Sequence, residues 1–194
     1  MPRAGLTPDR IVAEAGTVAD EVGLDRLTLA AVAQRCGVSL PGLYKHVSGV
    51  DEVRRGIAIA AVRDLTSVTA AAAAGLSGRA ALHAVSAAYR GYAHQHPGRY
   101  AASVIAPADG DQEHVNAAIE AYKVLTATFQ GYQLDSEELI HAVRMWRAAC
   151  HGVVSLEAAG GFGLPQSVDV TFTQMIDALD AAFGHLGSAS LTIR

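Results

Sequence analysis

Histidine side chains are the groups of this sequence that could most readily bind a metal ion. His94 and His96 alternate at the expected end of a helix, directly before Pro97. They would supply two ligands, but the surrounding sequence shows no third one, and a protein site for zinc needs at least three. His141 and His151 are ten residues apart, nearly three helical turns, so they would not share an ion. We therefore predict no metal and no cofactor.

The sequence also lacks the motifs of the common catalytic sites. It contains no glycine-rich phosphate loop, no Gly-x-Ser-x-Gly elbow and no His-Glu-x-x-His motif. Cys36 and Cys150 have neither the spacing of a metal site nor that of a disulfide framework, so we interpret both as small buried apolar side chains. An enzyme would need a catalytic pair that these spacings do not supply, and we predict that the chain is not one.

The segment TLAAVAQRCGVSLPGLYKH, which begins at Thr28, has the pattern of a helix-turn-helix. Such a motif packs two short helices at a steep angle across a tight turn. A small residue, Ala33, lets the second helix approach, and Gly37 permits the turn. The face turned toward the core is apolar and consists of Val32, Val38 and Leu43. The same pattern could also form an ordinary corner between two helices of a bundle.

The remaining elements are expected to be helices as well, because no segment alternates with a period of two residues. Hydrophobic residues make up 51% of the chain and alanine, the best helix former, dominates them. Helix start signals stand at Thr7, Thr28, Ser39 and Ser136. The expected helices span residues 8–22, 28–36, 39–46, 51–74, 79–96, 111–131, 135–159 and 167–184, with a short turn near 100–105.

Charge is distributed unevenly along the chain. The 194 residues carry a formal net charge of −4, which does not by itself indicate nucleic-acid binding. Residues 26–55 nevertheless carry a net charge of +3, which leaves −7 for the rest. The sign is right for this part of the chain to meet phosphate groups.

The N-terminal third resembles the TetR family of bacterial transcriptional repressors. The resemblance is carried by Thr28, Ala33, Gly37-Val38-Ser39 and Leu43-Tyr44-Lys45-His46, preceded by one amphipathic helix and followed by a long one. It implies an all-α fold with a three-helix DNA-binding domain, residues 1–50, and a helical ligand-binding and dimerisation domain, residues 51–194.

The resemblance also implies which residues meet DNA. The second helix of the motif enters the major groove near its N-terminus, while other contacts go to phosphate. The predicted DNA-binding residues are Thr28, Ser39, Leu40, Pro41, Gly42, Tyr44, Lys45 and His46.

Two positions depart from the family pattern. The family usually has an aromatic residue where Val47 stands, which predicts looser packing under the recognition helix. It often has lysine where Val50 stands, so one phosphate contact would be lost unless Arg54 or Arg55 replaces it. Gly42 lowers helix propensity by about 1 kcal/mol relative to alanine, and we expect modest sequence discrimination.

The C-terminal half resembles a subset of TetR regulatory domains, the WHG type, with the motif R-x-x-x-H-G-x-x-x-L-E, here from Arg147 to Glu157. In the family the last two helices pair with those of a second subunit. The predicted dimer-interface residues are Gly152, Leu156, Phe172, Met175, Ile176, Leu179 and Phe183.

A ligand pocket is implied among the helices that precede these two. Pockets are mostly apolar with a few polar groups. The residues predicted to line it are Tyr89, Tyr92, Tyr100, Tyr122, Phe129, His141, Met145, Trp146 and His151, although a residue of this kind is more often part of the core than a ligand contact. They indicate a small apolar or aromatic effector.

Together these features predict a homodimeric regulator, a repressor in the family's usual mode, that an effector releases from a pseudo-palindromic DNA operator. The alternative is a helical sensor whose DNA binding has weakened. No signal peptide is visible and no uninterrupted apolar run reaches the roughly 18 residues of a membrane span, so a cytoplasmic location is expected.

Overall fold

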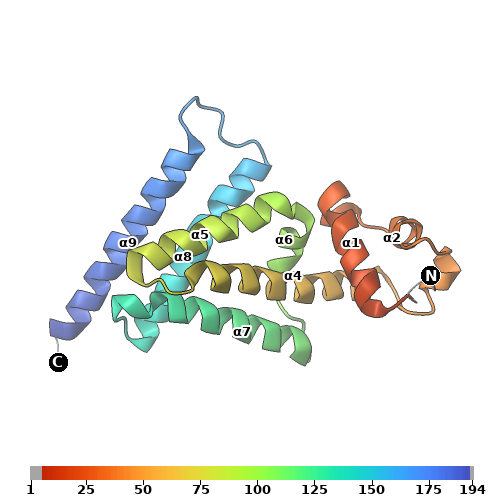
Figure 1. Ribbon diagram of the computed structural model, residues 1–194, viewed down its shortest axis with the longest axis horizontal. Helices are drawn as coiled ribbons and strands as arrows, with labels where there is room; N and C mark the ends of the chain where they lie inside the picture. Colours follow the sequence, from red (N-terminus) through yellow and green to blue (C-terminus); the bar gives the residue numbers. More distant parts are fainter. Residues whose placement is uncertain (1–5, 193–194) are drawn as a thin grey trace. The chain divides into compact units, whose positions relative to one another are not determined.

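Every regular element between residues 6 and 192 is a helix. The structure is a computed structural model that describes the backbone of these residues and the side chains of residues 6–187. Its elements, drawn in Figure 1, are α1 (Pro8–Val22), η1 (Leu24–Arg26), α2 (Leu29–Cys36), α3 (Leu40–Leu43), α4 (Val50–Ala73), α5 (Gly78–Gln95), α6 (Pro97–Ser103), α7 (Gln112–Phe129), η2 (Gln130–Tyr132), α8 (Ser136–Ala158) and α9 (Val168–Thr192). The predicted all-α fold is confirmed.

The chain divides into two compact units. Unit 1 comprises Met1–Leu65 and Gln95–Ile119, and unit 2 comprises Thr66–His94 and Glu120–Arg194. Helices α4 and α7 contribute residues to both. These units are defined by contacts between residues. The predicted boundary after residue 50 instead separates the DNA-binding part from the ligand-binding and dimerisation part, and it stays a prediction.

The start of α8 differs from the prediction. Asp135, not Ser136, is the N-cap, and its carboxylate accepts hydrogen bonds from the backbone N–H of Glu137 and Glu138 at 2.9 Å. The Glu138 carboxylate accepts one in return from the backbone N–H of Asp135 at 3.2 Å. The reason is the spacing, because an acid three residues before a glutamate forms a reciprocal capping box.

Unit 1 has a core of aliphatic side chains from its first four helices. Ile11, Val32, Leu43 and Val53 are fully or almost fully buried. Helix α6 lies directly on α1: a Cβ atom built on Gly98 would stand 2.1 Å from the carbonyl carbon and oxygen of Ala19. Only glycine permits this approach of two helix backbones.

Unit 2 is built around aromatic rings. The ring centroids of Phe129 and Phe183 lie 5.3 Å apart, and those of Tyr132 and Phe183 lie 5.7 Å apart. Trp146 is fully buried beside them, and its indole N–H donates to the Ser86 hydroxyl at 2.8 Å. A buried ring with a satisfied polar group combines a large buried apolar area with a fixed orientation.

Helix α9 extends eight residues beyond the predicted end at 184. Gly187 does not interrupt it and is itself buried against the chain. A Cβ atom at Gly187 would stand 1.8 Å from the carbonyl oxygen of Tyr132. Gly187 therefore serves close packing within unit 2.

Both cysteines are free and buried, as predicted. Cys36 belongs to the aliphatic core of unit 1, and Cys150 is fully buried in unit 2. Burial raises the pKa of the Cys36 thiol and raises that of the Cys150 thiol to about 12. Neither side chain is a ready nucleophile, because the thiolate is the reactive form.

One helix bears on the expectation about membrane spans. By length and average hydropathy alone, α4 could cross a membrane, although it contains no uninterrupted apolar run of that length. In unit 1 its residues Val53, Ile57, Ala58 and Ile59 are buried in protein.

Candidate nucleic-acid interface

Two short capped helices form the predicted DNA-binding motif. The Thr28 side chain accepts a hydrogen bond from the backbone N–H of Ala31 at 3.3 Å and so begins α2. Gly37 ends α2 in the left-handed conformation, with φ 70° and ψ 31°. Ser39 then begins α3 by accepting from the backbone N–H of Gly42 at 3.2 Å. All three features follow the sequence prediction.

The motif separates its buried side chains from its exposed ones. Val32, Ala33 and Leu43 are buried in the core of unit 1. Val47 is also buried, with 7% of its surface exposed, and joins the aliphatic cluster that contains Leu43. It also lines a cavity beside α4, and the looser packing expected at this position stays a prediction.

The predicted DNA-binding residues lie on the outside of this motif. Tyr44 is 54% exposed and Leu40 is 38% exposed, although both are large and partly apolar. Gly42 is half-buried, and the other five are exposed: Thr28, Ser39, Pro41, Lys45 and His46. The eight residues thus share one short, accessible stretch of the chain, which is what contact with DNA requires.

The charges around this motif are only partly available to phosphate. Lys45 has no carboxylate of the described residues within 4.0 Å. Arg35 is bound to Glu14 at 3.2 Å and to Glu21 at 2.5 Å, which joins α2 to α1. Less positive charge is therefore available to DNA phosphates than the net charge of this segment suggests.

Arg55, one of the two substitutes considered for the missing lysine, is engaged elsewhere. Its guanidinium donates to both carboxylate oxygens of Asp111 at 2.6 Å and to Glu113 at 3.2 Å. The paired guanidinium lowers the pKa of the Asp111 carboxyl to about 2. Arg54 is engaged as well: it donates to the carbonyl oxygen of Asp25 at 3.2 Å and lies 3.7 Å from the Asp51 carboxylate.

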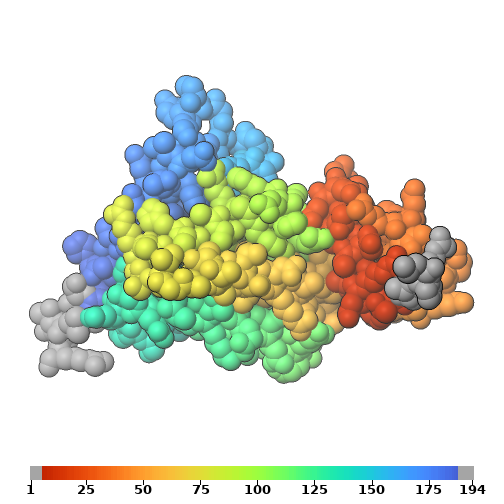
Figure 2. Space-filling view, viewed as in Figure 1, coloured from red at the N-terminus to blue at the C-terminus, as the bar shows by residue number. Residues whose placement is uncertain are grey.

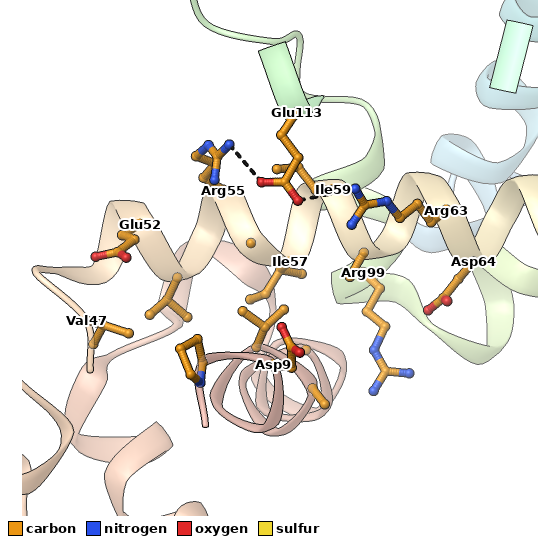
Figure 3. A pocket seen from close by; sticks show the side chains of 17 residues that line it. Asp9, Val47, Glu52, Arg55, Ile57, Ile59, Arg63, Asp64, Arg99 and Glu113 are labelled. Atoms are coloured by element: carbon orange, nitrogen blue, oxygen red, sulfur yellow. Dashed lines mark hydrogen bonds and ion pairs between the residues drawn. The ribbon is translucent and has the colours of Figure 1, made fainter. Parts of the chain in front are cut away.

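A cavity of about 560 Å³ lies within unit 1, between α1 and α4 (Figure 3). Glu113 bridges Arg55 and Arg63 along one side, and the Arg99 side chain lies on another. None of the predicted ligand-pocket residues lines this cavity. Sequence reasoning missed this cavity.

The predicted ligand-pocket residues fall into a buried set and an exposed set. Tyr89, Phe129 and Trp146 are buried in unit 2, and the rings of Tyr89 and Trp146 are 5.3 Å apart. Tyr122 and Met145 are 40% and 45% exposed. Of the others, Tyr92 is buried in unit 2, Tyr100 is buried in unit 1, His141 is exposed and His151 is half-buried.

The predicted dimer residues are also divided. Phe172, Ile176 and Phe183 are buried within the single chain, because this face of α9 packs on its own unit. Arg90, for example, lies over the Phe172 ring at 4.9 Å. Leu156 is 48% exposed. The other three, Gly152, Met175 and Leu179, are half-buried.

The connection between α8 and α9 adds apolar surface that the sequence reasoning did not select. In Figure 2 it lies at the top of the view, in blue. Leu164 is 78% exposed, and Phe162 and Val170 are 36% and 55% exposed.

The two alternating histidines do not act together. The His94 ring nitrogen Nε2 lies 2.9 Å from Glu157 in unit 2, whereas Nδ1 of His96 lies 3.3 Å from Asp20 in unit 1. Within the part of the chain that the structure describes, no three His, Cys, Asp or Glu side chains are grouped to hold a metal ion.

The protein is of the helix-turn-helix class, whose fold is typical of DNA-binding proteins. Its two short helices are joined by a tight glycine turn, and their exposed face carries polar and apolar side chains. Comparison with known proteins identifies the family to which the chain belongs. The family model described as "Tetracyclin repressor-like, C-terminal domain" matches residues 82–179. The chain belongs to the TetR family of transcriptional regulators, which are not enzymes.

Relatives in two organisms are similar over most of their length. The chain is 35% identical over 192 residues to the uncharacterized HTH-type transcriptional regulator Rv0681 of Mycobacterium tuberculosis, covering 96% of this chain and 88% of that protein. It is 30% identical over 161 residues to the uncharacterized HTH-type transcriptional regulator YobS of Bacillus subtilis, covering 83% and 84%.

Solved structures share the fold at lower identity. The transcriptional regulator SCO7222, a TetR from Streptomyces coelicolor, matches with a TM-score of 0.72 and 18% identity over 94% of this chain and all of that one. A variant of TetR from Acinetobacter baumannii in complex with minocycline matches with a TM-score of 0.70 and 19% identity, covering 94% and 98%.

Proposed function

We propose that this regulator is a homodimeric, cytoplasmic repressor that binds a pseudo-palindromic operator through α3 and is released by a small apolar or aromatic effector. One observation carries the DNA-binding part: the chain exposes Leu40, Tyr44 and Lys45 on a capped helix-turn-helix and buries the neighbouring Leu43 and Val47. Two such motifs in a dimer would contact half-sites about 34–36 Å apart.

The proposed dimer interface lies on the outer faces of α8 and α9. Because Phe172, Ile176 and Phe183 are used inside the chain, the proposal rests on the exposed Leu156 and the half-buried Gly152, Met175 and Leu179. Exposed apolar patches of this kind typically mark interaction sites. Sedimentation analysis of Leu156→Glu should show a lower dimer fraction than the parent, and an unchanged fraction would count against this face.

Effector release follows the family's usual behaviour. The minocycline complex of the Acinetobacter protein shows a small aromatic molecule on the same fold. An effector changes DNA affinity only to the extent that it binds the free and the DNA-bound conformations differently. The buried aromatic residues of unit 2, Tyr89, Phe129 and Trp146, are the proposed lining, with Tyr92 and His151 beside them in the same unit.

The DNA-binding assignment can be tested by a matched pair of tyrosine variants. Operator DNA would first be sought immediately upstream of the protein's own gene by mobility shift with excess competitor DNA. Tyr44→Ala should then weaken binding by about tenfold or more, the usual range for a lost hydrogen bond to a charged group, because this exposed side chain is proposed to contact the DNA backbone. Tyr122→Ala removes a tyrosine of similar exposure on α7 and should bind like the parent.

Salt dependence tests the charge contacts separately. Each phosphate contact changes the slope of log K against log salt by about 0.9. Lys45→Ala should therefore lower the slope by roughly 0.9 per subunit, whereas Lys123→Ala on α7 should leave it unchanged. Parent binding that lacks both sequence preference and salt dependence would favour the alternative, a helical sensor with weakened DNA binding, which the pairing of Arg35 and Arg55 with carboxylates also suggests.

A further inference from the structure

The exposed surface of α3 has an unusual chemical composition for a surface that reads bases. Leu40, Pro41 and Gly42 follow one another, and their side chains offer no hydrogen-bond donor or acceptor. The neighbouring hydroxyl, that of Ser39, already accepts the backbone N–H of Gly42 at 3.2 Å. The exposed side-chain surface of the first turn of α3 therefore consists of carbon atoms. Leu40 is 38% exposed, and Pro41 is also exposed.

The segment GVSLPGLYKHV, residues 37–47, also lacks most of the side chains that recognise particular bases. In the major groove, asparagine and glutamine pair with adenine, acids pair with cytosine, and arginine or lysine pairs with guanine. Thymine is the base recognised by apolar contact, through its C5-methyl group. Of these partners the segment contains one lysine, Lys45, and an apolar surface.

We propose that Leu40 and Pro41 read thymine, by packing against the C5-methyl groups that thymines expose in the major groove of each operator half-site. This inference rests on the proposed DNA-binding role of α3 and specifies what that role recognises. Cytosine would place its N4 amino group against the carbon atoms of Leu40 and Pro41, and these two side chains offer it no acceptor.

The neighbouring polar side chains would position this apolar surface. Tyr44 and Lys45 follow within one turn and are exposed, so they can contact phosphate or base edges while Leu40 and Pro41 meet the methyl groups. Leu43 and Val47 are buried in the core and hold the segment in place. In this arrangement the polar side chains would supply affinity for DNA, and the apolar side chains would distinguish thymine from the other bases.

Removing single methyl groups from DNA tests the inference directly. Duplexes would be selected from a random library by the full-length protein, and each thymine of the selected half-site would be replaced in turn by deoxyuridine, which lacks only the C5-methyl group. Burial of one methyl group corresponds to roughly a fourfold change in affinity. We expect about this loss at one or two adjacent positions of each half-site and none at the flanking thymines.

A variant assigns the contact to the side chain. Leu40→Ala should bind thymine and deoxyuridine duplexes equally at the position that Leu40 contacts, whereas Tyr44→Phe should retain the parent's sensitivity. Leu40 is exposed, so this variant should unfold at the same temperature as the parent, which circular dichroism checks. A Pro41→Ala variant provides a second, independent test at the adjacent position.

The outcomes separate this inference from the proposed function. Specific binding with no loss on any deoxyuridine substitution, or a selected half-site without thymine, would overturn thymine recognition and leave DNA binding intact. Failure to select any duplex would overturn the DNA-binding role and the inference with it. Loss at a position that persists in both Leu40→Ala and Pro41→Ala would assign the methyl contact to other residues and reject this one.

Discussion

Unit 1 and unit 2 are stabilised by different kinds of side chain. The buried cluster around α1 to α4 in unit 1 contains only aliphatic side chains and Cys36, and ion pairs such as Arg55–Asp111 tie its helices together. Unit 2 packs Phe129, Trp146 and Phe183 around one another. Aliphatic helices at close approach tolerate little added volume, whereas an aromatic cluster is most sensitive to the loss of a ring.

The largest expected effect is in unit 2. Phe183→Ala removes a fully buried ring that contacts Phe129 and Tyr132, and should lower the free energy of unfolding by about 3–5 kcal/mol. The chain has one tryptophan, Trp146, so its fluorescence reports the unfolding of unit 2 in urea. Leu76→Ala, at a 46% exposed position of the same unit, is the control and should change stability by about 0.5 kcal/mol or less.

This variant also separates the two roles considered for Phe183. If the side chain served the dimer interface, as the sequence predicted, Phe183→Ala would dissociate the dimer and leave the monomer's stability intact. Its burial predicts the opposite, a destabilised subunit.

An intermediate effect is expected from adding volume to unit 1. Gly98→Ala places a methyl group against the backbone of Ala19 and should cost at least about 1–3 kcal/mol. In urea, circular dichroism should show helix loss at concentrations where Trp146 fluorescence is still native. Gly91→Ala on α5, where a Cβ atom would meet nothing within 4 Å, should be neutral or stabilising. Coincident transitions in Gly98→Ala would show that the units do not unfold separately.

The smallest effect concerns the ion pair of unit 1. The pKa of Asp111 is lowered from 3.8 to about 2, mainly because Arg55 hydrogen-bonds to its charged form. A lowered carboxyl pKa stabilises the fold above pH 3.8, and that contribution disappears as the pH falls toward 2. Asp111→Asn should therefore flatten the dependence of stability on pH in this window, as measured by helix content in urea at each pH. A slope equal to the parent's would contradict the pairing.

Much of the helix-turn-helix could be predicted because its determinants are local. Thr28, Gly37 and Ser39 each act on backbone groups within four residues, so a cap or a left-handed glycine can be recognised from the order of residues alone. The exposed residues of the motif could be predicted for the same reason. Once the residues of a short helix that face the core are identified, the remaining ones must face solvent.

The errors came from contacts between distant residues. The apolar stripe of α9 was recognised, but periodicity does not reveal whether Phe183 packs on Phe129 or on a second subunit. The pairing of Arg55 with Asp111, 56 residues away, could not be predicted from charge counts. The cap of α8 is a different case, since the Asp135–Glu138 spacing was present in the sequence and was overlooked.

The burial of both cysteines makes this regulator convenient for chemical labelling. Thiol reagents attack the thiolate, and Cys36 and Cys150 are shielded from solvent with raised pKa values. A single cysteine introduced at an exposed serine, such as Ser48 beside the helix-turn-helix or Ser155 on α8, would then be the accessible thiol of the folded parent chain. Fluorophores or spin labels attached there would report distances between subunits on and off DNA, with no native residue replaced beyond the labelled one.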